Sequence, residues 1–161
     1  MKIEDIEPIS INLEAYNTTA FVSKGIPKIG IVVATFNKAI TSRLLKGALR
    51  YFREHLILDK NITVIFAPGA FELPVRAQQL LKSGLDVVIC LGCVIRGDTA
   101  HFDFVAGECA RGIMTASLNE NKPIIFGVLT TDTVEQALER CQEDTNNKGY
   151  EAAEAACQLF R

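Results

Sequence analysis

The chain has 161 residues, of which 48% are hydrophobic and 22% are charged, and its formal net charge at pH 7 is −2. This length and composition are typical of one globular domain with one core, so residues 1–161 are expected to form a single domain. The near-neutral charge excludes a global positive field, so neither nucleic acid nor an anionic membrane surface is an expected partner and any anion binding must be local.

The N-terminal segment, residues 1–27, has weak hydrophobic periodicity and several turn formers, which indicates an arm with one short strand near residues 10–13. Its start, MKIEDIEPIS, is acidic and lacks the basic and then apolar pattern of a signal peptide. The longest apolar run, residues 87–95, is far shorter than the ~20 residues that span a bilayer. A cytoplasmic location without a membrane partner is therefore expected.

Four continuous runs rich in β-branched residues are predicted to be strands buried on both faces. They are residues 29–34, 62–67, 86–95 and 123–129. Helical spacing of apolar residues predicts helices over residues 40–56, 71–81, 99–118, 133–141 and 149–160. The fourth helix is expected to be capped by Thr131 or Asp132. This alternation predicts an α/β fold for residues 28–161: a flavodoxin-like three-layer α/β/α sandwich around a four-stranded parallel sheet.

The five cysteines are an odd number, which suits a reducing compartment better than a disulfide framework. Cys90 and Cys93 form a C-x-x-C motif, but residues three apart in a strand point to opposite faces, which disfavours a redox or zinc site. Cys109, Cys141 and Cys157 fall among small or apolar residues of predicted helices, where packing is the simplest interpretation.

Ligands of open parallel sheets bind beyond the carboxyl ends of the strands. Four segments are predicted to meet there and form one site: residues 35–37, 68–72, 92–101 and 126–131. Phe36 directly follows a buried strand and could stack on a flat heterocycle, although an aromatic residue there can equally be core. Glu72, in the first turn of the next helix, is either a binding group or a partner of the helix dipole.

The third of these segments contains Arg96-Gly97-Asp98-Thr99, which leads into a helix. Free N–H groups and a flexible glycine at such a place can hold a phosphate, although Asp98 could be a simple N-cap. His101 follows in the first turn and is a candidate for proton transfer. The other histidine, His55, has no such loop beside it and is given a structural or surface role.

Arg140 and Lys148 bracket a polar break at residues 142–147 between the last two predicted helices. Both are candidates for anion binding, and both could also be simple partners of a helix dipole.

The sequence resembles the lumazine synthase family from about residue 29 to the end of the last predicted helix. The joint order and spacing of six segments carry the resemblance: Phe36-Asn37, Pro68 to Pro74, Leu91 to His101, Phe126 to Thr131, Glu135 to Ala137 with Glu139-Arg140, and Asn147 to Gly149. It implies condensation of 5-amino-6-(D-ribitylamino)uracil with 3,4-dihydroxy-2-butanone 4-phosphate to give 6,7-dimethyl-8-ribityllumazine and phosphate. This is the penultimate step of riboflavin biosynthesis and needs no cofactor. In agreement, the sequence has no convincing metal-ligand cluster and no G-x-G-x-x-G after its first strand.

The resemblance also implies a role for each matching position. His101 would transfer protons, and Arg140 would hold the phosphate and stabilise it as it leaves. The other matching positions would bind the substrates: Phe36, Ala70, Phe71, Glu72, Cys93, Val94, Ile95, Asp98, Thr99, Phe126 and Lys148. In this family the pyrimidine pocket, which Phe126 would complete, is assembled from two adjacent subunits.

The resemblance implies a homo-oligomer, either a pentamer or an assembly of pentamers that could form a capsid, with riboflavin synthase as a candidate partner, bound or enclosed. The sequence departs from the family pattern in two places. Residues 141–146 replace a link that usually contains glycine and lysine, with Asp144 where a lysine is frequent, and Cys93 stands where threonine is common.

Two other functional classes share this fold. One is a non-catalytic flavin- or nucleotide-binding module, but residues 34–38 lack the hydroxyl-rich and glycine-rich phosphate cradle expected after its first strand. The other is a structural shell protein in which the cleft is vestigial.

Overall fold

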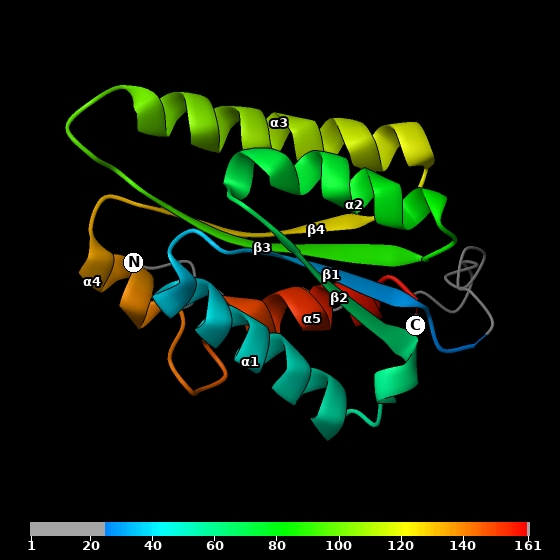
Figure 1. The fold of residues 1–161 in the computed structure, drawn as a ribbon. Coiled ribbons are helices and arrows are strands. Elements are labelled where there is room, and N and C mark those ends of the chain that lie inside the picture. The colour runs from blue at the N-terminus through cyan, green and yellow to red at the C-terminus, as the bar shows by residue number, and fades with distance from the viewer. Residues whose placement is uncertain (1–24, 161) are drawn as a thin grey trace, which may run out of the picture.

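The computed structural model describes residues 25–160, so the strand predicted near residues 10–13 lies outside the described residues. Within that range a parallel sheet has the strand order β2-β1-β3-β4 (Figure 1). Its strands are β1 (Ile29–Ala34), β2 (Ile62–Ala67), β3 (Val87–Ile95) and β4 (Ile124–Thr131). The four predicted strands are thus confirmed. β1 and β3 are buried almost throughout, as continuous β-branched runs suggest, whereas β2, at the edge of the sheet, is mostly only partly buried, so the predicted burial on both faces is wrong for β2.

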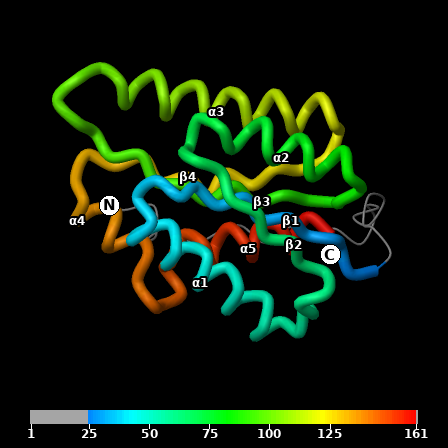
Figure 2. Tube along the Cα trace, viewed as in Figure 1, coloured from blue at the N-terminus to red at the C-terminus, as the bar shows by residue number. Residues whose placement is uncertain are grey.

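Helices cover both faces of the sheet, as Figure 2 shows along the chain trace. One face carries α1 (Lys38–Glu54) and α5 (Lys148–Gln158), and the other carries α2 (Leu73–Lys82) and α3 (His101–Glu120). The short elements are η2 (Asp59–Asn61), η3 (Ala70–Glu72) and α4 (Val134–Glu139). Two buried apolar clusters lie on the two sides of the sheet, which confirms the predicted three-layer architecture.

The two cysteines of β3 point to opposite faces of the sheet, as the alternation of side chains along a strand predicts. Cys93 belongs to the cluster under α1 and α5, whereas Cys90 belongs to the cluster under α2 and α3. All five cysteines are buried. Burial raises the pKa of the Cys109 thiol to about 12, so this side chain packs as a neutral apolar group.

The predicted cap of the fourth helix is wrong. β4 continues through Thr131, two residues beyond its predicted end, so Thr131 and Asp132 come too early to cap α4. Thr133 is the cap instead: its Oγ1 accepts a hydrogen bond from the Gln136 backbone N–H at 3.2 Å.

Helices α1 and α5 cross at very close range. A Cβ atom on Gly149 would collide with the Leu44 carbonyl group, and one on Gly47 would collide with the Asn147 side chain. Asn147 is only 2% exposed and its Oδ1 accepts hydrogen bonds from Gly149 N at 2.9 Å and Tyr150 N at 3.2 Å. These contacts fix the position at which α5 begins, and therefore the position of Lys148.

None of the helices within residues 25–160 is long and apolar enough to cross a membrane.

Candidate active site

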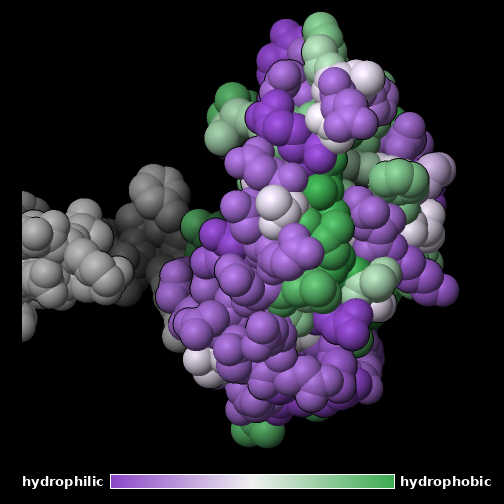
Figure 3. Space-filling view, turned by 90° about the vertical axis from the view of Figure 1, so that its left-hand side faces the viewer, coloured by the Kyte–Doolittle hydropathy of each residue, from purple (hydrophilic) through white to green (hydrophobic). Residues whose placement is uncertain are grey.

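A cleft of about 640 Å³ lies at the carboxyl ends of the strands. Seen from that end of the sheet, an apolar strip runs between hydrophilic side chains (Figure 3). Residues from three of the four predicted segments, together with the first turns of α3, line the cleft: Phe36, Asn37, Gly69, Ala70, Phe71, Glu72, Cys93, Val94, Ile95, Gly97, Thr99, His101, Phe102, Phe104 and Val105. The cleft therefore combines aromatic rings, one carboxylate and one imidazole over a mainly apolar floor.

The loop after β1 places Phe36 at the rim of the cleft. Backbone hydrogen bonds from Thr35 N to Ala67 O (2.8 Å) and from Phe36 N to Pro68 O (3.0 Å) continue the pairing of β1 and β2 beyond the strands. The Phe36 side chain is 71% exposed, so it is not a core residue. An exposed ring beside an apolar floor is suited to stacking on a flat heterocycle.

Asn37 holds this loop against β3. Its backbone is left-handed, with φ of 56°, a conformation that asparagine tolerates better than most residues. Its Nδ2 donates a hydrogen bond to the Cys93 carbonyl at 2.8 Å. The sequence contains Asn37 in the family pattern, but only the fold reveals its partner, because Cys93 is 56 residues away along the chain.

The segment after β2 turns sharply into η3. Glu72 Oε2 accepts a hydrogen bond from Gly69 N at 3.0 Å, while the same side chain lines the cleft. Ala70 is buried and Phe71 is largely exposed. Glu72 therefore stabilises the turn with one oxygen and also lies in the cleft, and its role as a binding group stays a prediction.

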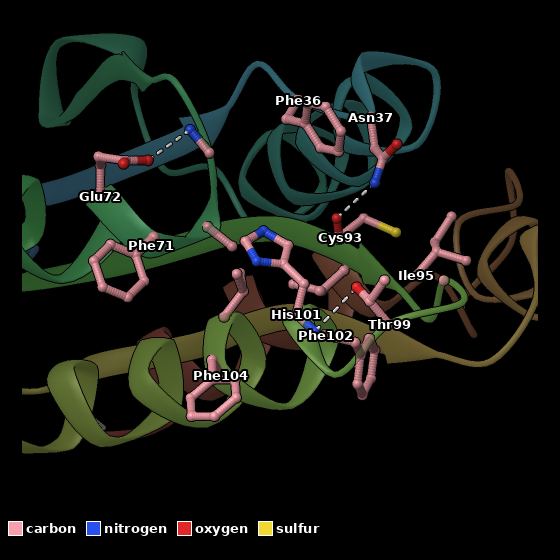
Figure 4. Close-up of a pocket in the computed structure, with 15 residues that line it drawn as sticks. Phe36, Asn37, Phe71, Glu72, Cys93, Ile95, Thr99, His101, Phe102 and Phe104 are labelled. Atoms are coloured by element: carbon pink, nitrogen blue, oxygen red, sulfur yellow. Dashed lines mark hydrogen bonds between the residues drawn. The ribbon is translucent and has the colours of Figure 1, made fainter.

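His101 begins α3, and its imidazole points into the cleft between Phe71 and Cys93 (Figure 4). Its backbone N–H donates to Thr99 Oγ1 at 3.4 Å, so the loop and the first turn of the helix support each other. Asp98 is not the N-cap of α3, because Ala100 occupies that position without a side-chain cap. Asp98 is also absent from the residues that line the cleft, although Gly97 and Thr99 on either side of it are present.

Arg96 fixes the loop of residues 97–100. Its Nε donates to Asp132 Oδ1 at 2.9 Å, its Nη1 donates to Asp103 Oδ1 at 3.2 Å, and its Cζ lies 4.2 Å from the centre of the Phe102 ring. The hydrogen bonds to Asp132 and Asp103 raise the pKa of Arg96, which therefore stays charged. The role of Arg96 in holding this loop could not be predicted from the sequence, because its partner Asp132 is 36 residues away along the chain.

Phe126, Arg140 and Lys148 lie in a second cavity of about 390 Å³, lined by β4, Arg140 and the start of α5. Arg140 Nη1 donates to Gln136 O at 2.9 Å, and Lys148 Nζ forms an ion pair with Glu151 Oε2 at 2.7 Å. Phe126 is 44% exposed. This cavity presents two cations and an aromatic ring, but none of its residues is shared with the His101 cleft.

The prediction that all four strand ends share one cleft is therefore wrong for a single chain. Residues 126–131 are not a loop but most of β4. Phe126 pairs in register with Cys90, whereas the cleft begins at Cys93, so Phe126 lies three residues, or roughly 10 Å, before the level at which the cleft begins.

Burial raises the pKa of the Cys93 thiol, at the floor of the cleft, to about 11. Cys93 is therefore a neutral thiol at pH 7 and not a thiolate nucleophile. Within residues 25–160, no cluster of histidine, cysteine or acidic side chains has the arrangement of a metal site.

Most of the chain matches the model of one known protein family. The model of the 6,7-dimethyl-8-ribityllumazine synthase family matches residues 27–161. The chain belongs to this family. Lumazine synthases are transferases of riboflavin biosynthesis, and the four-stranded parallel α/β sandwich found here is consistent with their fold.

Proposed function

We propose that the protein condenses 5-amino-6-(D-ribitylamino)uracil with 3,4-dihydroxy-2-butanone 4-phosphate to form 6,7-dimethyl-8-ribityllumazine and phosphate. One observation carries this proposal: an imidazole and an aromatic platform line one cavity of the chain, and two cations line another. The two cavities supply the groups that the two substrates require. Family membership supports this reaction class.

The pyrimidine would bind in the His101 cleft. Phe36 would stack on its ring, while the segments of residues 70–72 and 93–95 would contact the ring and the ribityl chain through backbone groups and Glu72. Phe36, Phe71 and Phe104 are all more than half exposed in the isolated chain, which is costly unless another surface or a ligand covers them. Phe126 of an adjacent copy would complete this pocket.

The phosphate of the ketone would bind where the loop of residues 97–99 meets cations from an adjacent copy. Thr99 offers a hydroxyl group and Gly97 an accessible backbone, and Asp98 lies between them in the same loop. Arg140 and Lys148 supply the positive charge that this loop lacks, since guanidinium and ammonium groups bind phosphate strongly. The proposed active unit is thus a homo-oligomer, a pentamer or an assembly of pentamers, with riboflavin synthase as a further candidate partner.

The reaction begins when a pyrimidine amine attacks the ketone and an imine forms with loss of water. Elimination of phosphate follows, and ring closure with loss of a second water gives the lumazine. His101 moves protons between the amine, the carbonyl oxygen and the carbon skeleton, and Arg140 stabilises the phosphate as it leaves. Holding both reactants in one cleft supplies much of the acceleration, because both are reactive in solution.

The test is to mix both substrates with the purified protein and record lumazine fluorescence. His101→Ala should slow turnover by roughly 10²–10⁴-fold without abolishing it, the range typical of proton-transfer groups. Arg140→Ala should raise the KM for the ketone phosphate and leave the KM for the pyrimidine nearly unchanged. Absence of lumazine formation by the wild-type protein, or a purified protein that carries tightly bound yellow flavin instead, would refute the proposed reaction.

A further inference from the structure

Helix α1 carries a basic stripe on the face of the sheet opposite α2 and α3. Arg43, Lys46, Arg50 and Arg53 are spaced by three, four and three residues, so they lie along one side of the helix. Together with Gly47, Glu143 and Asn147 they line a groove of about 260 Å³. Four cations and one carboxylate meet there in a chain whose formal net charge is −2, so the positive charge is strongly local.

The groove already holds one anionic group of the chain. The Glu143 carboxylate accepts a hydrogen bond from Lys46 Nζ, and this bond, with the charges of Lys46, Arg50 and Arg43, lowers the pKa of Glu143. Both side chains of the Lys46–Glu143 pair are about two-thirds exposed or more. An exposed pair of this kind contributes little, so a ligand with more negative charge can replace Glu143.

Two of the cations have no carboxylate partner, although Arg43 Nη1 donates a hydrogen bond to the Ala39 carbonyl of its own helix. Among the residues that the structure describes, neither Arg43 nor Arg53 forms an ion pair. Arg50 is held in place between them: its Nε lies 3.7 Å from Glu54 Oε1, and its Cζ lies 4.8 Å from the centre of the Tyr150 ring. The Arg50 Nε is shielded from solvent and has no hydrogen-bond partner in this part of the chain.

We propose that this groove is a second anion-binding site that takes a chain of phosphoryl groups in place of Glu143. The stripe from Arg43 to Arg53 spans roughly 15 Å along the helix, longer than one phosphate, so it suits several phosphoryl groups in a row. Arginine favours this class of ligand because its planar fork matches phosphate oxygens. Inorganic polyphosphate and the triphosphate of a nucleotide both contain such a row of phosphoryl groups, so both are candidate ligands of the groove.

The experiment is calorimetric titration of the full chain with inorganic tripolyphosphate. It is carried out in the Arg140→Ala/Lys148→Ala background, so that the cations of the proposed active site do not contribute. One tripolyphosphate per chain is expected to bind. Arg43→Ala/Arg53→Ala should weaken binding by roughly tenfold or more, and Glu143→Gln should tighten it several-fold because the competing carboxylate is gone.

Matched controls lie on the other face of the sheet. Arg76→Ala/Lys82→Ala removes the same amount of charge from α2, and Glu120→Gln removes a carboxylate paired with Lys82. Both should change the affinity by less than about twofold, because screening at ~0.15 M salt suppresses distant charges. If the two double variants weaken binding equally, the ligand is attracted by the total charge of the protein and not by the groove, which would overturn the proposal. Failure of Glu143→Gln to tighten binding would also overturn it.

A second titration, with a nucleoside triphosphate, separates the two sources of the ligand. If the nucleoside triphosphate binds more tightly than tripolyphosphate, the groove recognises a nucleotide. If the two bind equally, the groove recognises only the chain of phosphoryl groups. Lumazine formation plays no part in either titration, so failure of this proposal leaves the proposed reaction untouched.

Discussion

Asn37 and Cys93 are joined by a hydrogen bond of 2.8 Å between the Asn37 side-chain amide and the Cys93 carbonyl, and both residues line the cleft. It ties the loop that carries Phe36 to the strand that forms the cleft floor. Because Asn37 also adopts a left-handed backbone, the side chain and the backbone at this position make separable contributions.

Asn37→Ala and Asn37→Gly separate these contributions. Alanine loses the hydrogen bond and strains the backbone, with a total cost of about 2 kcal/mol in the free energy of unfolding. Glycine loses the hydrogen bond but accepts the left-handed conformation, so it should cost less. Urea unfolding measures both, and equal destabilisation by the two variants would show that the backbone at residue 37 is not strained.

Arg96→Lys keeps the positive charge but cannot bridge Asp132 and Asp103 while stacking on Phe102. Under the proposed function, the loop of residues 97–99 loosens and kcat/KM for the ketone phosphate falls by roughly tenfold. Stability should change by less than about 1 kcal/mol, because these ion pairs are exposed. Steady-state kinetics measures this effect, with Arg53→Lys as the control. Unchanged kinetics in Arg96→Lys would show that Arg96 does not position the loop for catalysis.

Cys93 gives the protein a predicted loss of stability at alkaline pH. Burial raises its pKa from 9.0 to about 11, so the folded state holds the thiol proton more tightly than the unfolded state does. This contribution to stability is complete below pH 9 and declines as the pH rises from 9 to 11.

Cys93→Ala should abolish that decline. The difference in unfolding free energy between wild type and Cys93→Ala should be constant below pH 9 and shrink between pH 9 and 11. Denaturant unfolding across this range provides both curves. A difference that stays constant up to pH 11 would mean that the thiol pKa is not raised.

Gly149→Ala tests the close crossing of α1 and α5. The added methyl group collides with the Leu44 backbone, which cannot move independently of α1, so a loss of about 3 kcal/mol or more is expected. Gly97→Ala makes the same chemical change where nothing lies within 4 Å and should stay within about 0.5 kcal/mol of wild type. If the thermal melts of the two variants coincide, the close packing of α5 against α1 at Gly149 is contradicted.

The strands and most helices could be predicted from the sequence, because buried parallel strands leave continuous β-branched runs such as residues 29–34 and 87–95. Residues that line the cleft could be predicted as well, because the carboxyl ends of neighbouring parallel strands meet at one edge of the sheet. Phe36, Glu72 and His101 lie there as predicted.

Three features could not be read from local sequence. The end of β4 at Thr131 depends on pairing with Ile95, so the cap at Thr133 was missed. Arg96 and Asp132 meet only because β3 and β4 are neighbours. The separation of Phe126 from His101 depends on the register of β3 and β4, which continuous apolar runs do not reveal because they lack a polar and an apolar face.

The proposed function requires that the His101 cleft of one copy and the Arg140 cavity of another form one active site. The direct test is to coexpress His101→Ala and Arg140→Ala chains with different affinity tags and to purify the oligomers that contain both. If the two groups act across an interface, about a quarter of the sites in a random mixture regain both native residues, and lumazine formation rises above the mean of the two parent oligomers. Activity equal to that mean would place His101 and Arg140 of the same chain in each site and would refute an active site shared between copies.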